Sequence, residues 1–275
     1  MMNVSSNAFG ATDMVYKDRF FVIAMLNCIL SGGLGTGLTF VEGWGYNKFN
    51  PAWIIGAGII IFGIFALPVI DFINRKSASI YRRGIYAITG GVAFSYLFTA
   101  PGINTFIVAP MNIWLRITGL IFGIGGNIVW CIMSVKACNM NRNNPEFLSA
   151  IYVDHGDYFS YSTYTSENVL KKVRFKKSRF KFNLWLPIYL LIPILPLYPL
   201  TFALRRMLEP IIGDVGFEIF IGFVYIPFSL CLNAFLITVF YTYFYSPMKL
   251  TRETGKPVYL SDYWGGPEKP YPGAK

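Results

Sequence analysis

Long apolar runs separated by short polar segments are the main feature of the chain. About 20 consecutive apolar residues are needed for a helix to cross the hydrocarbon core of a membrane. Such runs are Phe20–Phe40, Ala52–Ile70, Ile113–Ser134, Leu184–Leu204 and Phe217–Tyr245. A shorter run, Ile85–Thr99, stays apolar past Pro101 as far as Val108, and we interpret it as one kinked span. The pattern predicts an all-α integral membrane protein, a bundle of about six transmembrane helices.

The composition supports this prediction. Of the 275 residues, 54% are hydrophobic and 14% are charged, whereas soluble domains carry about 25% charged residues. The 25 Phe, 18 Tyr and 6 Trp agree with it, since aromatic side chains gather at membrane interfaces. Such a composition excludes an intrinsically disordered chain and argues against a soluble enzyme.

The distribution of charge predicts the orientation. The net charge is +10, which in a soluble chain would indicate nucleic-acid binding. Here the basic residues concentrate before the first span, between the second and third, between the fourth and fifth, and after the sixth. Because cytoplasmic loops retain Lys and Arg, we expect a multi-pass protein of the bacterial inner membrane with both termini in the cytoplasm and no nucleic-acid partner.

The polar segments divide the chain into four parts. Residues 1–138 form a four-span unit, 139–183 a cytoplasmic basic loop, 184–245 a two-span hairpin and 246–275 a Pro/Gly-rich cytoplasmic tail. In the loop, Phe147–Val153 and Tyr158–Thr165 flank the turn-forming segment Asp154–Asp157, which predicts a short β-hairpin-like insertion. The prolines of the tail favour an extended segment.

Two glycine pairs have the spacing of close helix packing. Gly33 and Gly37 form a GxxxG motif in the first span, and Gly119 and Gly123 form another in the fourth. Small residues at this spacing let two helix backbones approach closely, so we expect these four glycines at helix contacts. The alternative for the first pair is a pore loop lined by backbone carbonyls.

Charged residues gather where the outer ends of the spans are expected. The predicted outer-face set is Arg116, Arg205, Arg206 and Glu218. A charge at the edge of the hydrocarbon pairs, extends to the interface or serves a function. We expect an ion pair between Arg116 and Glu218 that joins the fourth span to the sixth.

A basic segment directly precedes the fifth span. Its cations are Lys171, Lys172, Arg174, Lys176, Lys177, Arg179 and Lys181. Each basic residue near an anionic membrane surface contributes about 1 kcal/mol of attraction. We therefore expect this segment to bind anionic lipid headgroups.

No enzyme signature is found in the sequence. His155 is the only histidine, which excludes a two-histidine metal site, and the cysteines form no CxxC pair. We expect no catalytic residue, no metal and no cofactor. The deep polar residues Asn27, Asn127 and Asn233 are of a kind that commonly joins transmembrane helices.

These features favour a function in protein binding. The segments 139–183 and 246–275 protrude from the predicted bundle and are suited to contact a partner. The sequence predicts a subunit of a membrane complex or an immunity-type protein against a membrane-active toxin. The alternative is a small channel or transporter that uses the proline-broken fifth span, because a broken helix can mark a substrate site.

Overall fold

The computed structural model describes residues 9–45, 50–74, 80–142, 148, 151–161, 186–191 and 216–260. Its helices are α1 (Phe9–Gly45), α2 (Ala52–Ile61), α3 (Leu67–Asn74), α4 (Ile80–Val108), α5 (Ile113–Leu120), α6 (Gly126–Arg142), α9 (Leu186–Leu191), α11 (Gly216–Phe240) and α12 (Ser246–Thr254). Three π-helical turns, η1 (Phe62–Ala66), η2 (Ile121–Gly125) and η3 (Tyr241–Tyr245), link α2 to α3, α5 to α6 and α11 to α12.

Five helical stretches of the described part are long and apolar enough to cross a membrane. They are Phe21–Gly43, Ala52–Ile73, Ile80–Val108, Ile113–Met140 and Gly222–Thr254. They match the first four predicted spans and the sixth, so the helical prediction is confirmed, and these five apolar runs form helices of membrane-spanning length. The predicted fifth span, Leu184–Leu204, lies outside the described residues except for α9. The third span is one continuous helix, α4, with Pro101 inside it.

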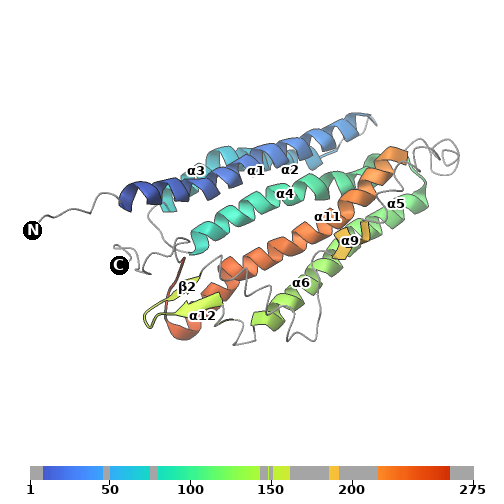
Figure 1. Cartoon of the computed structure of the whole chain (residues 1–275). Helices are drawn as coiled ribbons and strands as arrows, with labels where there is room; N and C mark the ends of the chain where they lie inside the picture. Colours follow the sequence, from blue (N-terminus) through green and yellow to red (C-terminus); the bar gives the residue numbers. More distant parts are fainter. Residues whose placement is uncertain are drawn as a thin grey trace, which may run out of the picture.

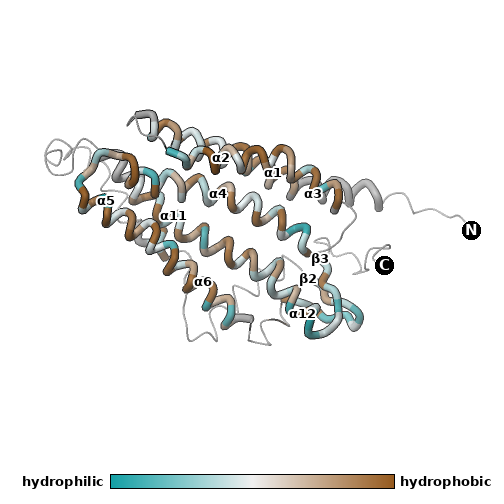
Figure 2. Tube along the Cα trace, turned by 180° about the vertical axis from the view of Figure 1, so that it is seen from behind, coloured by the Kyte–Doolittle hydropathy of each residue, from teal (hydrophilic) through white to brown (hydrophobic). Residues whose placement is uncertain are grey.

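The helix α4 is the central element of the bundle. It packs along α1 on one side and along α11 on the other, while α2 packs mainly against α1 and α6 against α11 (Figure 1). Figure 2 shows hydrophobic positions along the outer helices and hydrophilic positions gathering at α12 and the strands. Phe72, with 77% of its surface exposed, and Trp114, with 74%, are among the large apolar side chains on the outside. An apolar exterior of this kind suits a lipid environment.

Two of the three π turns have the same local cause. Pro68 and Pro247 each stand two residues after the end of a π turn, η1 and η3 respectively. A proline ring inside a helix clashes with the carbonyl four residues earlier and supplies no N–H. Widening the preceding turn by one residue relieves this clash, at the cost of a carbonyl without its backbone donor.

A small sheet lies at the end of the bundle where α4 begins (Figure 1). Strand β1 (Tyr152–Asp154) pairs antiparallel with β2 (Phe159–Tyr161), and β2 pairs parallel with β3 (Val258–Leu260). The hairpin lies where the sequence predicts it, with shorter strands; residues 162–165 of the predicted second strand are outside the described part. The third strand comes from the tail.

The first part of the predicted tail is helical instead of extended, and residues 261–275 lie outside the described part. Ser246–Thr254 continues the last span as helix α12, which ends at Gly255 in the left-handed conformation, with a φ of 72°. Pro247 lies in the first turn of α12, directly after the widened turn η3. Only after Gly255 does the chain become extended and enter the sheet as β3.

The sheet has its own hydrophobic core against the bundle. Its buried residues are Ile80, Ile151, Tyr152, Phe159, Tyr161 and Val258. Ile80 begins α4, and the half-buried Tyr243 of η3 packs against the same core. We call residues 148, 151–161 and 246–260 the sheet unit. Its core is shared with α4 and with η3, so its position on the bundle is set by side-chain packing.

Candidate functional site

Five uncharged polar side chains meet in the middle of the bundle. They are Ser95 and Thr99 of α4, Asn127 of α6, and Ser229 and Asn233 of α11. The Asn233 amide donates to Asn127 Oδ1 at 2.7 Å, and Ser95 Oγ donates to Asn233 Oδ1 at 2.5 Å. The hydroxyls of Thr99 and Ser229 lie 2.9 Å apart. Three helices are thus joined by one network of hydrogen bonds.

The Asn127 side chain forms one of its hydrogen bonds with the widened turn η2. The Asn127 amide donates to the carbonyl of Gly123 at 2.6 Å and to Ser229 Oγ at 3.0 Å. Asn127 stands two residues after η2, the place that proline takes after η1 and η3. Its side chain therefore supplies, from within the same helix, a donor for a carbonyl of the π turn.

The polar contacts continue from this network along α11 toward the sheet unit. Ser134 Oγ donates to the Ala234 carbonyl at 3.0 Å, and Cys138 Sγ lies 4.0 Å from Thr238 Oγ1. Thr242 Oγ1 then donates to the Thr238 carbonyl at 2.8 Å. We call the whole set the polar seam: Ser95, Thr99, Asn127, Ser134, Cys138, Ser229, Asn233, Thr238 and Thr242.

The seam ends at a contact with the sheet unit. The hydroxyl of Tyr152, a residue only 4% exposed, donates to the Thr242 carbonyl at 2.9 Å. In η3 the Ser246 N–H bonds the carbonyl of Tyr241, and the next donor along the turn would be residue 247, which is proline. The Thr242 carbonyl consequently has no donor from the backbone of the π turn, and Tyr152 supplies one.

The surroundings of Tyr152 keep this donor protonated. Burial raises the pKa of the Tyr152 phenol above its usual 10.0, and the nearby hydroxyl of Tyr161 raises it further, while a hydrogen bond from Ser246 opposes the shift. Because only the neutral phenol carries a proton to donate, the raised pKa preserves the contact with Thr242 into alkaline solution.

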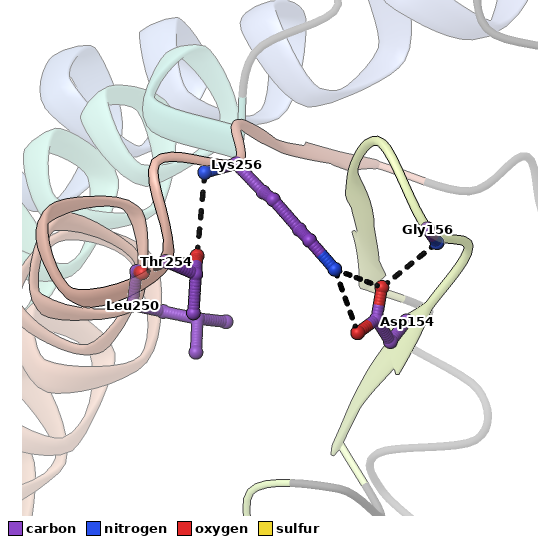
Figure 3. A network of polar contacts seen from close by, with 5 residues as sticks. All are labelled: Asp154, Gly156, Leu250, Thr254 and Lys256. Carbon is purple, nitrogen blue, oxygen red and sulfur yellow. Dashed lines mark hydrogen bonds and ion pairs between the residues drawn. The ribbon is translucent and has the colours of Figure 1, made fainter.

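An ion pair connects the hairpin to Lys256, just after the end of α12 (Figure 3). Lys256 Nζ lies 3.0 Å from both carboxylate oxygens of Asp154, whose Oδ1 also accepts from the Gly156 N–H at 2.9 Å. The hydrogen bond from the Gly156 N–H, and then the hydrogen bonding of Lys256, lower the pKa of Asp154. Gly156 has a φ of 91°, a conformation that favours glycine. The Asp154–Asp157 turn is therefore held by turn geometry and by Lys256.

Aromatic side chains cover one part of the sheet unit. The rings of His155 and Tyr158 stack with their centroids 4.9 Å apart, and Tyr158 meets Tyr259 edge to face at 5.8 Å. His155 Nε2 lies 2.8 Å from Ser160 Oγ. All three aromatic residues are half-buried. Their partly exposed faces give the unit a surface of aromatic and hydrogen-bonding groups.

A carboxylate at the other end of the bundle joins α1 to α4. Glu42 accepts from the Asn104 amide at 2.5 Å and from Thr105 Oγ1 at 3.1 Å. Asn104 is 3% exposed and Thr105 is 1% exposed. Both stand on the turn of α4 that follows Pro101. No sequence pattern marks Glu42, because the residue falls just past the first apolar run and matches no motif.

A buried ion pair lies near the sheet end of the bundle. The Arg82 Nη2 of α4 lies 2.5 Å from an Asp71 oxygen of α3, and Arg82 Nε donates to the Tyr86 hydroxyl at 2.9 Å. The Tyr86 hydroxyl also donates to Asp71. This triangle joins the second span to the third beside the sheet unit.

The structure places the four predicted packing glycines in two different situations. A Cβ at Gly119 would overlap the Phe106 ring, and one at Gly123 would lie 3.4 Å from Ile103 Cγ1. At Gly33 and Gly37, by contrast, a Cβ would find no heavy atom of the described neighbouring elements within 4 Å.

The close contacts of α1 are made by other glycines. A Cβ at Gly35 would lie 2.7 Å from Tyr96 Cε1, and one at Gly32 would lie 3.2 Å from Ile60 Cγ1. The face of α1 that packs against α4 and α2 is thus rotated away from the GxxxG pair. Spacing alone does not reveal which glycines of a Gly-rich run face a neighbour.

The predicted outer-face charges are described only in part. Arg116 Nη2 donates to the Ala109 carbonyl at 2.8 Å, and its Nε is buried with no hydrogen-bond partner among the described residues. Arg205 and Arg206 lie outside those residues, as does the side chain of Glu218, so the ion pair between Arg116 and Glu218 stays a prediction. The same holds for the lipid contacts of Lys171–Lys181.

Within the described ranges, no three His, Cys, Asp or Glu side chains lie close enough together to hold a metal ion. The candidate site consists of the polar seam and the sheet unit, which are connected through Tyr152 and Thr242. Comparison with known protein families, curated proteins and solved structures found no match for the chain.

Proposed function

We propose that this chain is a six-span protein of the bacterial inner membrane that binds another protein through its sheet unit. The orientation with both termini in the cytoplasm comes from the alternation of basic segments, which would place the sheet unit on the cytoplasmic side. The described apolar helices support the multi-pass part of this proposal.

The observation that carries the proposal is the construction of the sheet unit. Two segments far apart in the sequence, the loop strands β1 and β2 and the tail strand β3, form one sheet. Tyr152 and Ile80 attach this sheet to the bundle, and Lys256 attaches the hairpin to the end of α12. A surface held in this way keeps its shape without a partner, which lowers the entropic cost of binding one.

The exposed part of this unit has the residue types of a protein interface. The partly exposed rings of Tyr158, Tyr259 and His155 lie beside the charged groups of Asp154 and Lys256. Tyrosine is enriched among the residues that dominate binding energy, and interfaces place such aromatic groups inside a polar rim. The partner would be another subunit of a membrane complex or a membrane-active toxin that this chain neutralises.

Purification of the full chain in mild detergent tests the proposal. We expect a stoichiometric partner with the wild type and its loss in the Tyr158→Ala/Tyr259→Ala variant, which changes the aromatic surface. Phe72→Ala, on the lipid-facing side of α3, is the matched control and should retain the partner. A wild-type chain that always purifies alone, with no phenotype on deletion of residues 261–275, would contradict the proposal.

The second candidate is a small channel or transporter. It is based on the prolines of the fifth apolar run at 187, 193, 196 and 199, which would break a membrane helix. The hydrogen bonds of the polar seam join its side chains to one another and to helix carbonyls, which is typical of helix packing and favours the first proposal. Liposomes containing the protein separate the two: ion flux that changes in Pro196→Ala would support transport, and tight liposomes would exclude it.

A further inference from the structure

We infer that η3 is a conformational joint that couples the sheet unit to the polar seam inside the bundle. The inference rests on the proposed function only where it concerns a partner that binds the sheet unit. The coupling itself rests on the geometry of η3.

The first step is the unusual source of the donor for the Thr242 carbonyl. At η2 the Gly126 N–H bonds the carbonyls of both Ile121 and Phe122, and the Asn127 side chain of the same helix donates to the carbonyl of Gly123. At η3 the Ser246 N–H bonds the Tyr241 carbonyl, proline occupies the position of Asn127, and the donor to Thr242 is Tyr152, which is 90 residues away in the sequence. The hydrogen bonding of η3 therefore depends on whether the sheet unit is seated.

The second step is that η3 has an alternative arrangement that needs no hydrogen bond from the sheet unit. If Tyr152 leaves, the Ser246 N–H can turn from the Tyr241 carbonyl to that of Thr242, the bond of an ordinary α-helix. The Tyr152–Thr242 and Ser246–Tyr241 bonds are then lost and one bond is formed, and the Pro247 ring meets the carbonyl of Tyr243, so the π turn is favoured as long as Tyr152 is in place. Two arrangements whose balance depends on the Tyr152 contact are the property that a switching element needs.

The third step is the size of the movement. Converting a π turn to an α turn shifts the following residues by one helical position, about 100° of rotation and 1.5 Å of rise. In the other direction along α11, Thr242 Oγ1 bonds the Thr238 carbonyl, and Thr238 Oγ1 bonds the Ala234 carbonyl at 3.2 Å. Ser134 bonds that same carbonyl, so a change at η3 reaches the contact between α6 and α11.

A partner that lifts β1 from the bundle would thus release η3 and loosen the seam. A partner that presses the sheet unit onto the bundle would do the opposite. Either way, binding outside the membrane would be transmitted to side chains within it.

Hydrogen exchange and thiol alkylation of the full chain in nanodiscs test this coupling. Tyr152→Phe removes the hydroxyl and keeps the ring. We expect exchange of the backbone amides of residues 238–246, and alkylation of Cys138 on the seam, to become about two- to tenfold faster, the effect of one ordinary hydrogen bond on a local opening equilibrium. Peptide mass spectrometry reads Cys138 separately from the other cysteines.

Tyr259→Phe is the matched control. Tyr259 is a half-buried tyrosine of the same sheet, on β3, and its ring contacts Tyr158 instead of α11. It should leave both rates at their wild-type values. A Tyr152→Phe variant whose changes stay within the sheet unit, or one that matches Tyr259→Phe, would overturn the inference.

Pro247→Ala provides a test that does not depend on one variant alone. The new N–H at residue 247 can bond the Thr242 carbonyl within the π turn, which makes the Tyr152 hydroxyl dispensable. We expect Tyr152→Phe to have a smaller effect in this background, and the double variant to accumulate even if Tyr152→Phe alone does not. Equal effects of Tyr152→Phe in both backgrounds, or failure of the double variant to accumulate, would refute the proposed coupling through η3.

These measurements use the protein without a partner, so they are independent of the proposed function. Loss of partner capture in the Tyr158→Ala/Tyr259→Ala variant bears on the proposed function alone. An unchanged rate of Cys138 alkylation in Tyr152→Phe bears only on the coupling through η3.

Discussion

Asn127 and Asn233 face each other across the contact between α6 and α11, with the Asn233 amide donating to Asn127 Oδ1 at 2.7 Å. Each amide has a further role: Asn127 also bonds the Gly123 carbonyl, and Asn233 also accepts from Ser95. This pair therefore connects the widened turn η2 to α4 through α11.

Replacing Asn233 by Leu is expected to destabilise the protein by about 1–2 kcal/mol, because Asn127 and Ser95 lose their partner inside the bundle. Thermal unfolding in detergent measures the effect. Ile132→Leu, at an exposed position of α6, is the control and should unfold like the wild type. The Asn127→Leu/Asn233→Leu variant should lose less than the sum of the single variants, since the two residues share a bond. Additive losses would show that the pair contributes nothing as a pair.

The glycines of α1 provide a second prediction. Gly35→Ala should cost about 1–3 kcal/mol, because its Cβ would press on the Tyr96 ring and on the backbone of Leu97. Gly37→Ala should be neutral or stabilise the helix by up to about 1 kcal/mol, since alanine has the higher helix propensity and the site is open among the described elements. Unfolding temperatures of the two variants, measured under the same conditions, test this prediction. The opposite order would mean that the GxxxG pair makes the contact instead.

Arg116 leads to a third prediction. An unpaired charge within the hydrocarbon costs roughly 2.5–3.5 kcal/mol on insertion scales. If Glu218 is its partner, Arg116→Leu should lower the unfolding temperature, and adding Glu218→Leu should recover part of the loss.

The contact of Arg116 with the Ala109 carbonyl is the competing contribution. A loss in Arg116→Leu that Glu218→Leu does not recover would assign the stabilisation to that contact. Equal unfolding temperatures for the wild type and Arg116→Leu would show that neither the ion pair with Glu218 nor the contact with Ala109 stabilises the protein.

The raised pKa of Tyr152 leads to a prediction about pH. The folded-state pKa lies above the usual 10.0, so the unfolded chain releases this proton first as the pH rises. The contribution of Tyr152 to stability is therefore complete below pH 10 and decreases as the pH rises above it.

Stability measured from pH 9 to pH 11 should fall less steeply in Tyr152→Phe than in the wild type, because the variant lacks this titrating group. Other tyrosines titrate in the same range, so the comparison is between the two slopes. Identical slopes would show that Tyr152 ionises normally in the folded protein.

The sequence by itself determined the membrane character and the positions of the long helices. The length of an apolar run is a local property, so the spans that became α1, α4 and α11 could be located without a fold. The hairpin around Asp154–Asp157 could be located for the same reason, because turn-forming residues between two apolar stretches act locally.

The tertiary structure decided which residues face one another. On α1 the close helix contact is made at Gly35 and not at Gly37, because the rotation of a helix about its axis depends on its neighbours. The tertiary structure brings β3 beside β2, a pairing between residues 159 and 258 that no local pattern contains. It also places the Tyr152 hydroxyl on the carbonyl that Pro247 leaves without a backbone donor. Such contacts depend on the packing of the whole bundle, because the donor and the acceptor come together only once α4, α11 and the sheet are in place.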